Sequence, residues 1–251
     1  MLNFMRQIIS KLRGQGIGIQ EIQKLIRKED PVILEIGCHD GTNTRMFLEA
    51  FRNARVYAFE PHPEVAAEFR QKIKDSRCRL FELAVCDNDG EAKFYLSSAA
   101  AGKKGRGDAY SSIKKPAEHM KIYPGIEFKE SVTVKAKRLD TWAAENNIGK
   151  IDFIWADIQG AERELIRGGL KALEKTDYFY TEFNNRELYE GQPGLRQIRS
   201  MLPDFTLLRI YGHNALFKNK RKASGINDYG LYLYERVINM KNHLTGNIYR
   251  I

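Results

Sequence analysis

The chain is poor in cysteine and has no long hydrophobic run. Its 251 residues include three cysteines, Cys38, Cys78 and Cys86, which show no metal-ligand spacing and cannot form an even disulfide set. No apolar stretch approaches the roughly 20 residues that a membrane helix requires. The N-terminus lacks the apolar core and cleavage site of a secretory signal. We therefore expect a cytoplasmic protein without a transmembrane segment.

Acidic residues are also in the minority. The chain has 41 Lys and Arg against 32 Asp and Glu, a formal net charge of +9. This excess favours anionic partners such as nucleic acid, phosphorylated sugars or an acidic membrane surface. The alternative is that the charge serves solubility alone. Because 43% of the residues are hydrophobic, the chain can bury a full core.

The dinucleotide-binding fingerprint is incomplete. Residues 32–41 read VILEIGCHDG, an apolar run typical of a buried parallel strand, followed by a turn. Gly37 and Gly41 allow the backbone to bend and a ligand to approach. The third glycine is missing, and His39 stands in place of the middle one. The pattern therefore disfavours a pyrophosphate cradle and favours a ribose-bearing ligand without pyrophosphate, such as S-adenosylmethionine.

An acidic residue also ends the next apolar run. Residues 55–59 read RVYAF and are followed by Glu60-Pro61. A carboxylate at the end of a second strand can accept hydrogen bonds from both hydroxyls of a ribose. Together with Glu35 on the first strand, Glu60 completes a candidate nucleoside site.

Strands and helices alternate along most of the chain. We expect strands over residues 32–36, 55–59, 79–87, 92–96, 131–136, 151–156, 178–181, 205–211 and 215–218. The intervening segments have helical periodicity. This alternation predicts an α/β fold, a doubly wound and mostly parallel sheet with helices on both faces. If 92–96 and 131–136 lie beside the main sheet, seven core strands remain.

The sequence also suggests boundaries. Residues 1–30 carry two short helical patterns around a glycine hinge, and residues 31–218 form the main domain. Within it, residues 97–126 begin as a stretch of small, glycine-rich and basic composition, which we expect to be a mobile lid; the alternative is plain disorder. Residues 219–251 form a basic tail with one helix around 231–240.

Polar groups follow two further buried strands. Asp157 to Glu162 read DIQGAE, and Glu182 to Asn184 follow the next strand. Asp157 could bind donor or acceptor, act as a base, or hold a divalent cation with Glu182 and Asn184, since oxygen ligands suit Mg²⁺ or Ca²⁺. The structural alternatives are a helix cap for Asp157 and a helix-dipole contact for Glu162.

Two histidines are further candidates for a base. His39 lies in the first glycine turn, where it could contact the donor, and His213 lies between the last two strands. Cys38 and Cys86 are expected to be small core residues rather than nucleophiles.

These motifs together resemble class I S-adenosylmethionine-dependent methyltransferases of Rossmann-like fold and, within that class, the FkbM family. The resemblance rests on residues 35–41, 59–61, 83–87 with Gly90, 137–140, 151–152, 157–162 and Glu182. It implies methyl transfer to an oxygen, typically a sugar hydroxyl of a glycan or natural product. The donor-binding residues that we expect are Glu35, Gly37, Cys38, His39, Asp40, Gly41, Glu60, Pro61, Ala84, Val85 and Asp157. The catalytic candidates are Asp157, Glu162, Glu182 and His39.

The chain departs from the family pattern at several positions. Glu35 and His39 replace a usual Asp and Asn, and Trp155 and Gln159 replace the Lys and Glu of K-x-D-x-E-G. Trp155 and Gln159 favour one alternative, a ligand-binding scaffold that has lost catalysis. The basic loop and tail favour another, a nucleic-acid (RNA) methyltransferase. We expect a carbohydrate or other hydroxyl-bearing acceptor, which could be anionic. The chain could also form a homo-oligomer.

Overall fold

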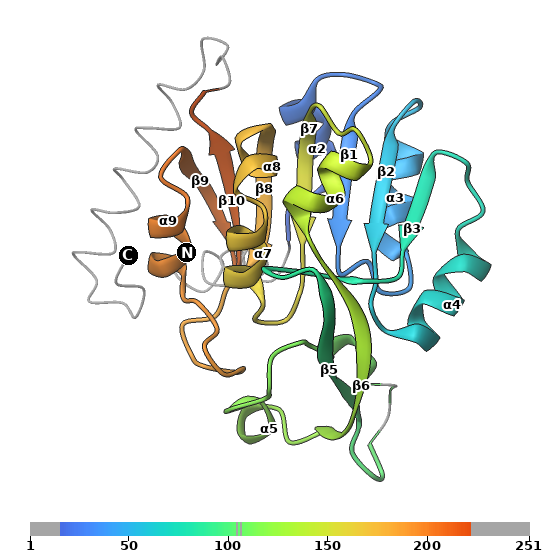
Figure 1. The fold of residues 1–251 in the computed structure, drawn as a ribbon, viewed down its shortest axis with the longest axis vertical. Helices are drawn as coiled ribbons and strands as arrows, with labels where there is room; N and C mark the ends of the chain where they lie inside the picture. Colours follow the sequence, from blue (N-terminus) through green and yellow to red (C-terminus); the bar gives the residue numbers. More distant parts are fainter. Residues whose placement is uncertain (1–15, 104, 106, 222–251) are drawn as a thin grey trace, which may run out of the picture.

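Two β-sheets of unequal size form the frame of the protein (Figure 1). The computed structural model describes residues 16–103, 105 and 107–221. The large sheet has the strand order β3-β2-β1-β7-β8-β10-β9. Its strands are β1 (Val32–Ile36), β2 (Arg55–Phe59), β3 (Cys78–Phe81), β7 (Ile151–Ala156), β8 (Thr176–Glu182), β9 (Phe205–Tyr211) and β10 (Asn214–Asn219). Only β10 runs antiparallel to its neighbours, so the predicted mostly parallel sheet of seven strands is confirmed.

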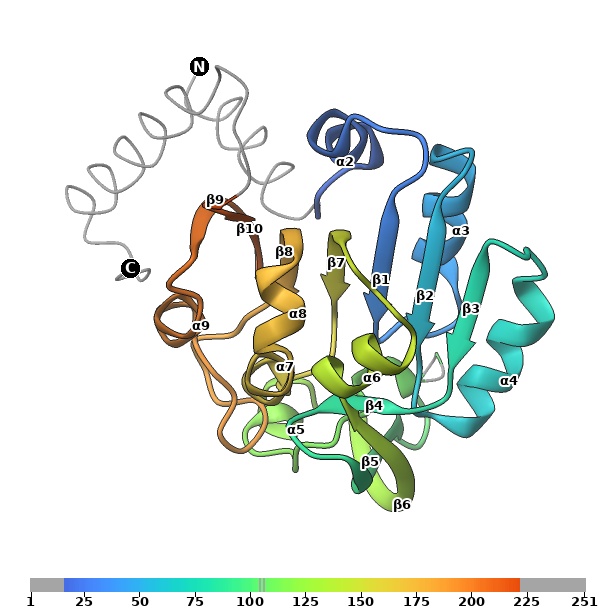
Figure 2. The same cartoon turned by 45° about the horizontal axis from the view of Figure 1, so that its top comes forward.

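Helices cover both faces of the large sheet, as predicted (Figure 2). On one face, α2 (Ile19–Ile26) and α3 (Thr42–Ala50) bury apolar side chains against β1 and β7, with α4 (Pro63–Lys72) beside β2. The opposite face is covered by α6 (Leu139–Glu145), α7 (Glu162–Gly168), α8 (Leu170–Glu174) and α9 (Leu195–Met201). Two apolar layers therefore fix the sheet from both sides.

The central strands end in register. Ile36 of β1 pairs with Phe59 of β2 and with Ala156 of β7. Because all three strands run parallel, the residues that follow them emerge side by side at one edge of the sheet. This edge faces the small sheet in Figure 1.

The single strand expected over residues 79–87 is a wrong prediction. The chain turns after β3, where the amide N–H of Leu83 donates to the carbonyl oxygen of Phe81 at 3.0 Å. It then enters β4 (Ala84–Cys86), which pairs with β6 (Ile126–Arg138) of the small sheet. The apolar run is continuous in sequence because both halves are buried, although in different sheets.

The segment of helical periodicity between β7 and β8 forms two helices, α7 and α8. α7 ends at Gly168, which lies against β4: a Cβ added there would lie 1.9 Å from the carbonyl oxygen of Cys86. The chain bends at Gly169 and continues as α8. This close contact attaches the small sheet to the core.

Residues 97–126 contain more regular structure than the expected loop. β5 (Gly90–Ala99) pairs antiparallel with β6, and the segment between them includes η1 (Asp108–Tyr110) and α5 (His119–Ile122). We call residues 100–125 the insertion. Tyr95 of β5 exchanges backbone hydrogen bonds with Ser112, at 2.7 and 3.1 Å, which holds the insertion against β5. The mobility of this segment stays a prediction.

The ends of the chain are only partly described. Of the two helices predicted in residues 1–30, the second corresponds to α2, and the first lies outside the described residues. The helix predicted around 231–240 also lies outside them. Within the described part of the chain, no helix is both long enough and apolar enough to cross a membrane.

Candidate functional site

A cavity of about 310 Å³ opens at the strand ends. This volume lies within the usual range of small-molecule sites, roughly 300–1,000 Å³. The predicted residues that line it are Cys38, His39, Asp40, Gly37, Glu60, Pro61, Ala84, Val85 and Asp157. The structure therefore brings together nine predicted site residues from β1, β2, β4 and β7 and the turns that follow them.

Gly37 lines the cavity where the chain leaves β1, beside the end of β7. Its φ is +82°, and an added Cβ would lie 1.9 Å from the carbonyl oxygen of Asp157. The amide N–H groups of Gly37 and Cys38 both donate to the carbonyl oxygen of Phe59, at 2.9 and 3.0 Å. The turn is thus fixed to both neighbouring strands, and only glycine fits at this position.

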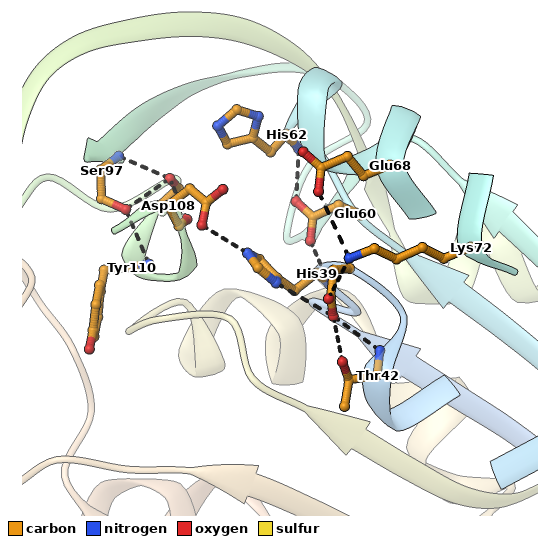
Figure 3. A network of polar contacts seen from close by, with 11 residues as sticks. His39, Thr42, Glu60, His62, Glu68, Lys72, Ser97, Asp108 and Tyr110 are labelled. Carbon is orange, nitrogen blue, oxygen red and sulfur yellow. Dashed lines mark hydrogen bonds and ion pairs between the residues drawn. The ribbon is translucent and has the colours of Figure 1, made fainter. Parts of the chain in front are cut away.

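Glu60 lies at the end of β2 and is nearly buried. Its two carboxylate oxygens accept hydrogen bonds from the backbone N–H groups of His39 and His62, each at 2.9 Å (Figure 3). Burial raises the pKa of Glu60 to about 7, and these N–H donors oppose that shift. A carboxylate held in this way can still accept hydrogen bonds from a diol in the cavity.

His39 connects the first turn to the insertion. Its backbone has φ +46°, and its Nε2 lies 3.1 Å from Oδ1 of Asp108 (Figure 3). Asp108 belongs to η1. A hydrogen bond holds η1 against β5, since the amide N–H of Tyr110 donates to Oγ of Ser97 at 3.1 Å. One wall of the cavity therefore belongs to the insertion rather than to the large sheet.

Asp40 lines the cavity but has structural partners. Its Oδ1 accepts hydrogen bonds from the backbone N–H and the hydroxyl of Thr42, at 3.1 and 2.7 Å, at the first turn of α3. Its Oδ2 accepts from Lys72 at 2.7 Å. The Lys72 ammonium holds the pKa of Asp40 well below its usual range. Asp40 therefore stabilises the turn as well as facing the cavity.

Acidic side chains predominate in the described lining of the cavity. Among the residues that the structure describes, the lining includes Asp40, Glu60, Asp108 and Asp157 and no Lys or Arg, while Lys72 contacts Asp40 from outside the lining. A pyrophosphate would be repelled here, whereas a cation would be attracted. S-adenosylmethionine carries a sulfonium, a ribose diol and an adenine, and apolar groups such as Leu83 also line the cavity. The residues present fit this donor.

Asp157 and Glu182 form a pair of interacting carboxyl groups at the ends of β7 and β8. Asp157 is accessible from the cavity, whereas Glu182 lies behind it and does not line the cavity. Burial, followed by the charge of Asp157, raises the pKa of Glu182 well above its usual range. Burial also raises the pKa of Asp157, and the hydrogen bonds with Gln159 and Glu182 oppose that shift.

Several predicted site residues lie outside the lining of the cavity. Gly41 is buried against α4, where an added Cβ would lie 2.7 Å from the side chain of Ile73. Glu162 is fully buried, and its Oε1 accepts a hydrogen bond from the backbone N–H of Gly160 at 3.1 Å. His213 lies in the turn between β9 and β10, where its carbonyl oxygen accepts from the N–H of Phe183. These three residues support the frame of the site.

Glu35 is also buried away from the cavity. It lies under α3 and accepts a hydrogen bond from the hydroxyl of Thr44. Its neighbour in register is Trp155, whose ring centroid lies 4.5 Å from that of Tyr180. Trp155, which replaces the lysine of the family pattern, is thus part of the core on this face. Burial raises the pKa of Glu35 to about 8.

We expect Glu35→Gln to reduce the pH dependence of stability. The folded chain retains a proton on Glu35 between pH 4.5 and pH 8, whereas the unfolded chain releases it. The stabilisation is therefore complete below pH 4.5 and is lost as the pH rises through 8, by up to about 1.4 kcal/mol per pH unit. Glutamine has no such proton to lose. Urea unfolding of both proteins across this range measures the difference.

The exposed Glu49 on α3 supplies the matched control for this prediction. Glu49→Gln should leave the pH dependence unchanged. Part of the dependence should persist in Glu35→Gln, because burial also raises the pKa of Glu162 to about 8. If the free energy of unfolding of Glu35→Gln depended on pH as steeply as that of the wild-type protein, Glu35 would have the same pKa in the folded and unfolded chains.

The structure does not assemble the predicted metal ligands into a recognisable site. Among the described residues, no group of three or more His, Cys, Asp or Glu side chains could hold a metal ion. Oδ1 of Asn184 accepts a hydrogen bond from the backbone N–H of Arg186 at 3.0 Å, so the oxygen that Asn184 could offer to a metal already has a partner. A cation held by Asp157 and Glu182 stays a prediction.

The insertion supplies residues that sequence reasoning missed. Asp108, Ala109, Ser111 and Ile113 line the cavity opposite the strand ends. Their sequence, within a polar and glycine-rich stretch, has no motif that marks a binding site. The only signal is their place after β5, beside the expected strand ends, which predicted a lid but no individual residue.

Comparisons with known proteins agree with this geometry. Residues 35–213 match the methyltransferase FkbM domain. The 2-O-methyltransferase NoeI of Sinorhizobium fredii (strain NBRC 101917 / NGR234) is 42% identical over 190 residues, which cover 75% of this chain and 78% of that protein.

Similar solved structures are much more distant. The Methanococcus jannaschii fibrillarin pre-rRNA processing protein has 14% identity and a TM-score of 0.46, covering 84% of this chain and 72% of its own. A SAM-dependent methyltransferase from Aquifex aeolicus has 12% identity and a TM-score of 0.41, and the match covers 85% of this chain and 96% of that structure. Similarity this low carries no argument about substrate.

Proposed function

This chain belongs to the methyltransferase FkbM domain family, and we propose that it transfers the methyl group of S-adenosylmethionine to a hydroxyl oxygen of a carbohydrate. The observation that carries the proposal is the acidic cavity at the ends of β1, β2 and β7. Within the described lining, an NAD-type ligand with two phosphates would meet four carboxyl groups and no Lys or Arg.

The donor side follows from the positions of Gly37 and Glu60. Glu60 would accept hydrogen bonds from the ribose hydroxyls, and the glycine turn would leave room for the rest of the nucleoside. The acidic surroundings would favour the positive charge of the sulfonium. S-adenosylmethionine supplies the electrophilic methyl group when it is bound.

Asp157 is the residue best placed to assist the acceptor. It faces the cavity from the end of β7, and its hydrogen bonds with Gln159 and Glu182 favour its charged form. A hydroxyl has a pKa far above neutrality, so a carboxylate that takes its proton during methyl transfer lowers the barrier. Positioning of the two reactants supplies much of the remaining acceleration.

The choice of oxygen and of carbohydrate rests on a relative. NoeI is a 2-O-methyltransferase by name, and its similarity covers three quarters of both chains. We extend its type of acceptor atom to this chain. The sugar is the expectation that the FkbM resemblance implies.

The test is methyl transfer from labelled S-adenosylmethionine to a panel of free sugars, glycans and RNA. We expect label in carbohydrate, at an oxygen identified by mass spectrometry. Glu60→Gln should weaken donor binding, measured by calorimetry, by about tenfold to a hundredfold, because hydrogen bonds to a charged acceptor contribute roughly 1.5–3 kcal/mol. The exposed Glu64 on α4 supplies the matched control.

Other outcomes would select another function. Label in RNA alone, with binding that weakens steeply as salt rises, would identify a nucleic-acid methyltransferase. Donor binding without transfer to any acceptor would identify a scaffold of the same fold. Equal binding of NAD and S-adenosylmethionine would contradict the assignment of the donor.

A further inference from the structure

The side-chain amide of Gln159 lies between the two carboxyl groups of the site. Its Nε2 is 2.6 Å from Oδ1 of Asp157 and 3.0 Å from Oε2 of Glu182. Carboxylate oxygens accept hydrogen bonds, and of the two ends of the amide only the nitrogen donates them. The two contacts therefore fix the orientation of the amide and use both of its N–H groups.

The backbone of Gln159 is constrained as well. Its φ is +50°, a left-handed conformation that non-glycine residues rarely adopt, and its carbonyl oxygen accepts the hydroxyl of Ser112 at 2.7 Å. The next residue, Gly160, has φ +93° and leaves no room for a Cβ beside Tyr189. Uncommon backbone conformations of this kind persist where the surrounding structure holds them, often at functional sites.

A third contact fixes the far end of the same side chain. The single hydroxyl hydrogen of Tyr189 lies between two acceptors, Oε1 of Gln159 at 3.2 Å and the carbonyl oxygen of Tyr110 at 2.7 Å. Tyr110 belongs to η1 and Tyr189 follows β8. Gln159 thus joins the ends of β7 and β8 to the insertion.

We propose that Gln159 is a positioning residue that holds the carboxylate of Asp157 toward the acceptor hydroxyl. This role rests on the proposed function. As the oxygen–carbon bond forms and the carbon–sulfur bond breaks, the hydroxyl proton passes to an oxygen of Asp157, and the donor leaves as a neutral thioether. Gln159 gives up no proton and acts only through Asp157.

The identity of the residue follows from its neighbours. A glutamate at position 159, which the FkbM pattern usually has, would place three carboxyl groups within hydrogen-bond distance of one another. The amide instead supplies one N–H group to each carboxyl and needs no proton to do so. This arrangement explains how the chain departs from the family pattern and keeps an oriented acid at the end of β7.

The experiment compares Gln159→Met with the wild-type protein. Methionine has a similar length but no N–H group, so the Asp157 carboxylate should lose its orientation. We expect kcat to fall roughly tenfold to a hundredfold, while the dissociation constant for S-adenosylmethionine, measured by calorimetry, changes by less than about twofold. Gln192, which is buried beyond the cavity, gives the matched control, and Gln192→Met should leave kcat unchanged.

A double-mutant cycle separates positioning from a general structural role. If Gln159 acts through Asp157, adding Gln159→Met to Asp157→Asn should lower kcat by less than about twofold. An equal loss in both backgrounds would overturn the proposal, as would unchanged kcat in the single variant. Loss of donor affinity in parallel with kcat would also overturn it, since Gln159 would then be a donor ligand.

Failure of the proposed function would be distinguishable from failure of this inference. If the wild-type protein methylates no acceptor, the proposed function fails. A crystal structure of Gln159→Met then tests the positioning directly. Rotation of the Asp157 carboxylate from its wild-type position supports the inference, and an unchanged carboxylate contradicts it.

Discussion

Replacing Gly37 by alanine is expected to abolish donor binding and to destabilise the fold by roughly 3–5 kcal/mol. The new Cβ would lie 1.9 Å from the carbonyl oxygen of Asp157 and would require a non-glycine residue at φ +82°. To relieve the contact, β1 and β7 would have to separate at their carboxyl ends. These ends pair in register and line the cavity. Urea unfolding and calorimetric titration with S-adenosylmethionine measure the two effects.

Gly149, which precedes β7, provides the matched substitution. A Cβ added there meets no atom within 4 Å, so Gly149→Ala should change stability by about 0.5 kcal/mol or less. If Gly37→Ala instead bound the donor normally, the close approach of β1 and β7 would not be needed for the site.

Asp157→Asn is expected to lower kcat by about 10²- to 10⁴-fold, the usual contribution of a general base. Asparagine keeps the size of the side chain but cannot take the proton of the acceptor hydroxyl at neutral pH. The KM for the donor should rise only severalfold, since Glu60 and the glycine turn remain. Steady-state kinetics with a carbohydrate acceptor separates the two parameters.

A matched Asp→Asn change at the opposite end of the sheet controls for the loss of charge. Asp30 is exposed and precedes β1, so Asp30→Asn should leave kcat unchanged. A wild-type rate in Asp157→Asn would assign the proton transfer to another group. His39, which faces the same cavity, would then be the next candidate.

Two residues of the cavity lining, Gly37 and Glu60, could be placed from the sequence because their signal is local. Gly37 and Glu60 directly follow apolar strands, and parallel strands bring such residues to one edge. The pattern failed where burial alone decides the outcome. Glu35 is an acidic residue on the strand that leads into the glycine turn, as a donor ligand would be. Because side chains alternate between the two faces of β1, however, Glu35 lies under α3.

The opposite wall was beyond the reach of sequence reasoning. Asp108 lies 69 residues from His39 in sequence, and no periodicity marks either residue as a partner of the other. The break between β3 and β4 was equally hidden, because both halves of residues 79–87 have apolar, strand-like character. Contacts between two different sheets leave no regular spacing in a single chain.

The two walls of the cavity differ in how far their sequences can change. One wall comes from the ends of the large sheet, where a single added methyl group at Gly37 would strike the backbone. The other comes from the insertion between β5 and β6, outside the large sheet. Changes in the length or sequence of the insertion would remodel its own wall of the cavity and leave the wall formed by the strand ends unchanged. A lineage built on this plan can therefore vary the insertion side of its cavity while it inherits the strand-end side unchanged.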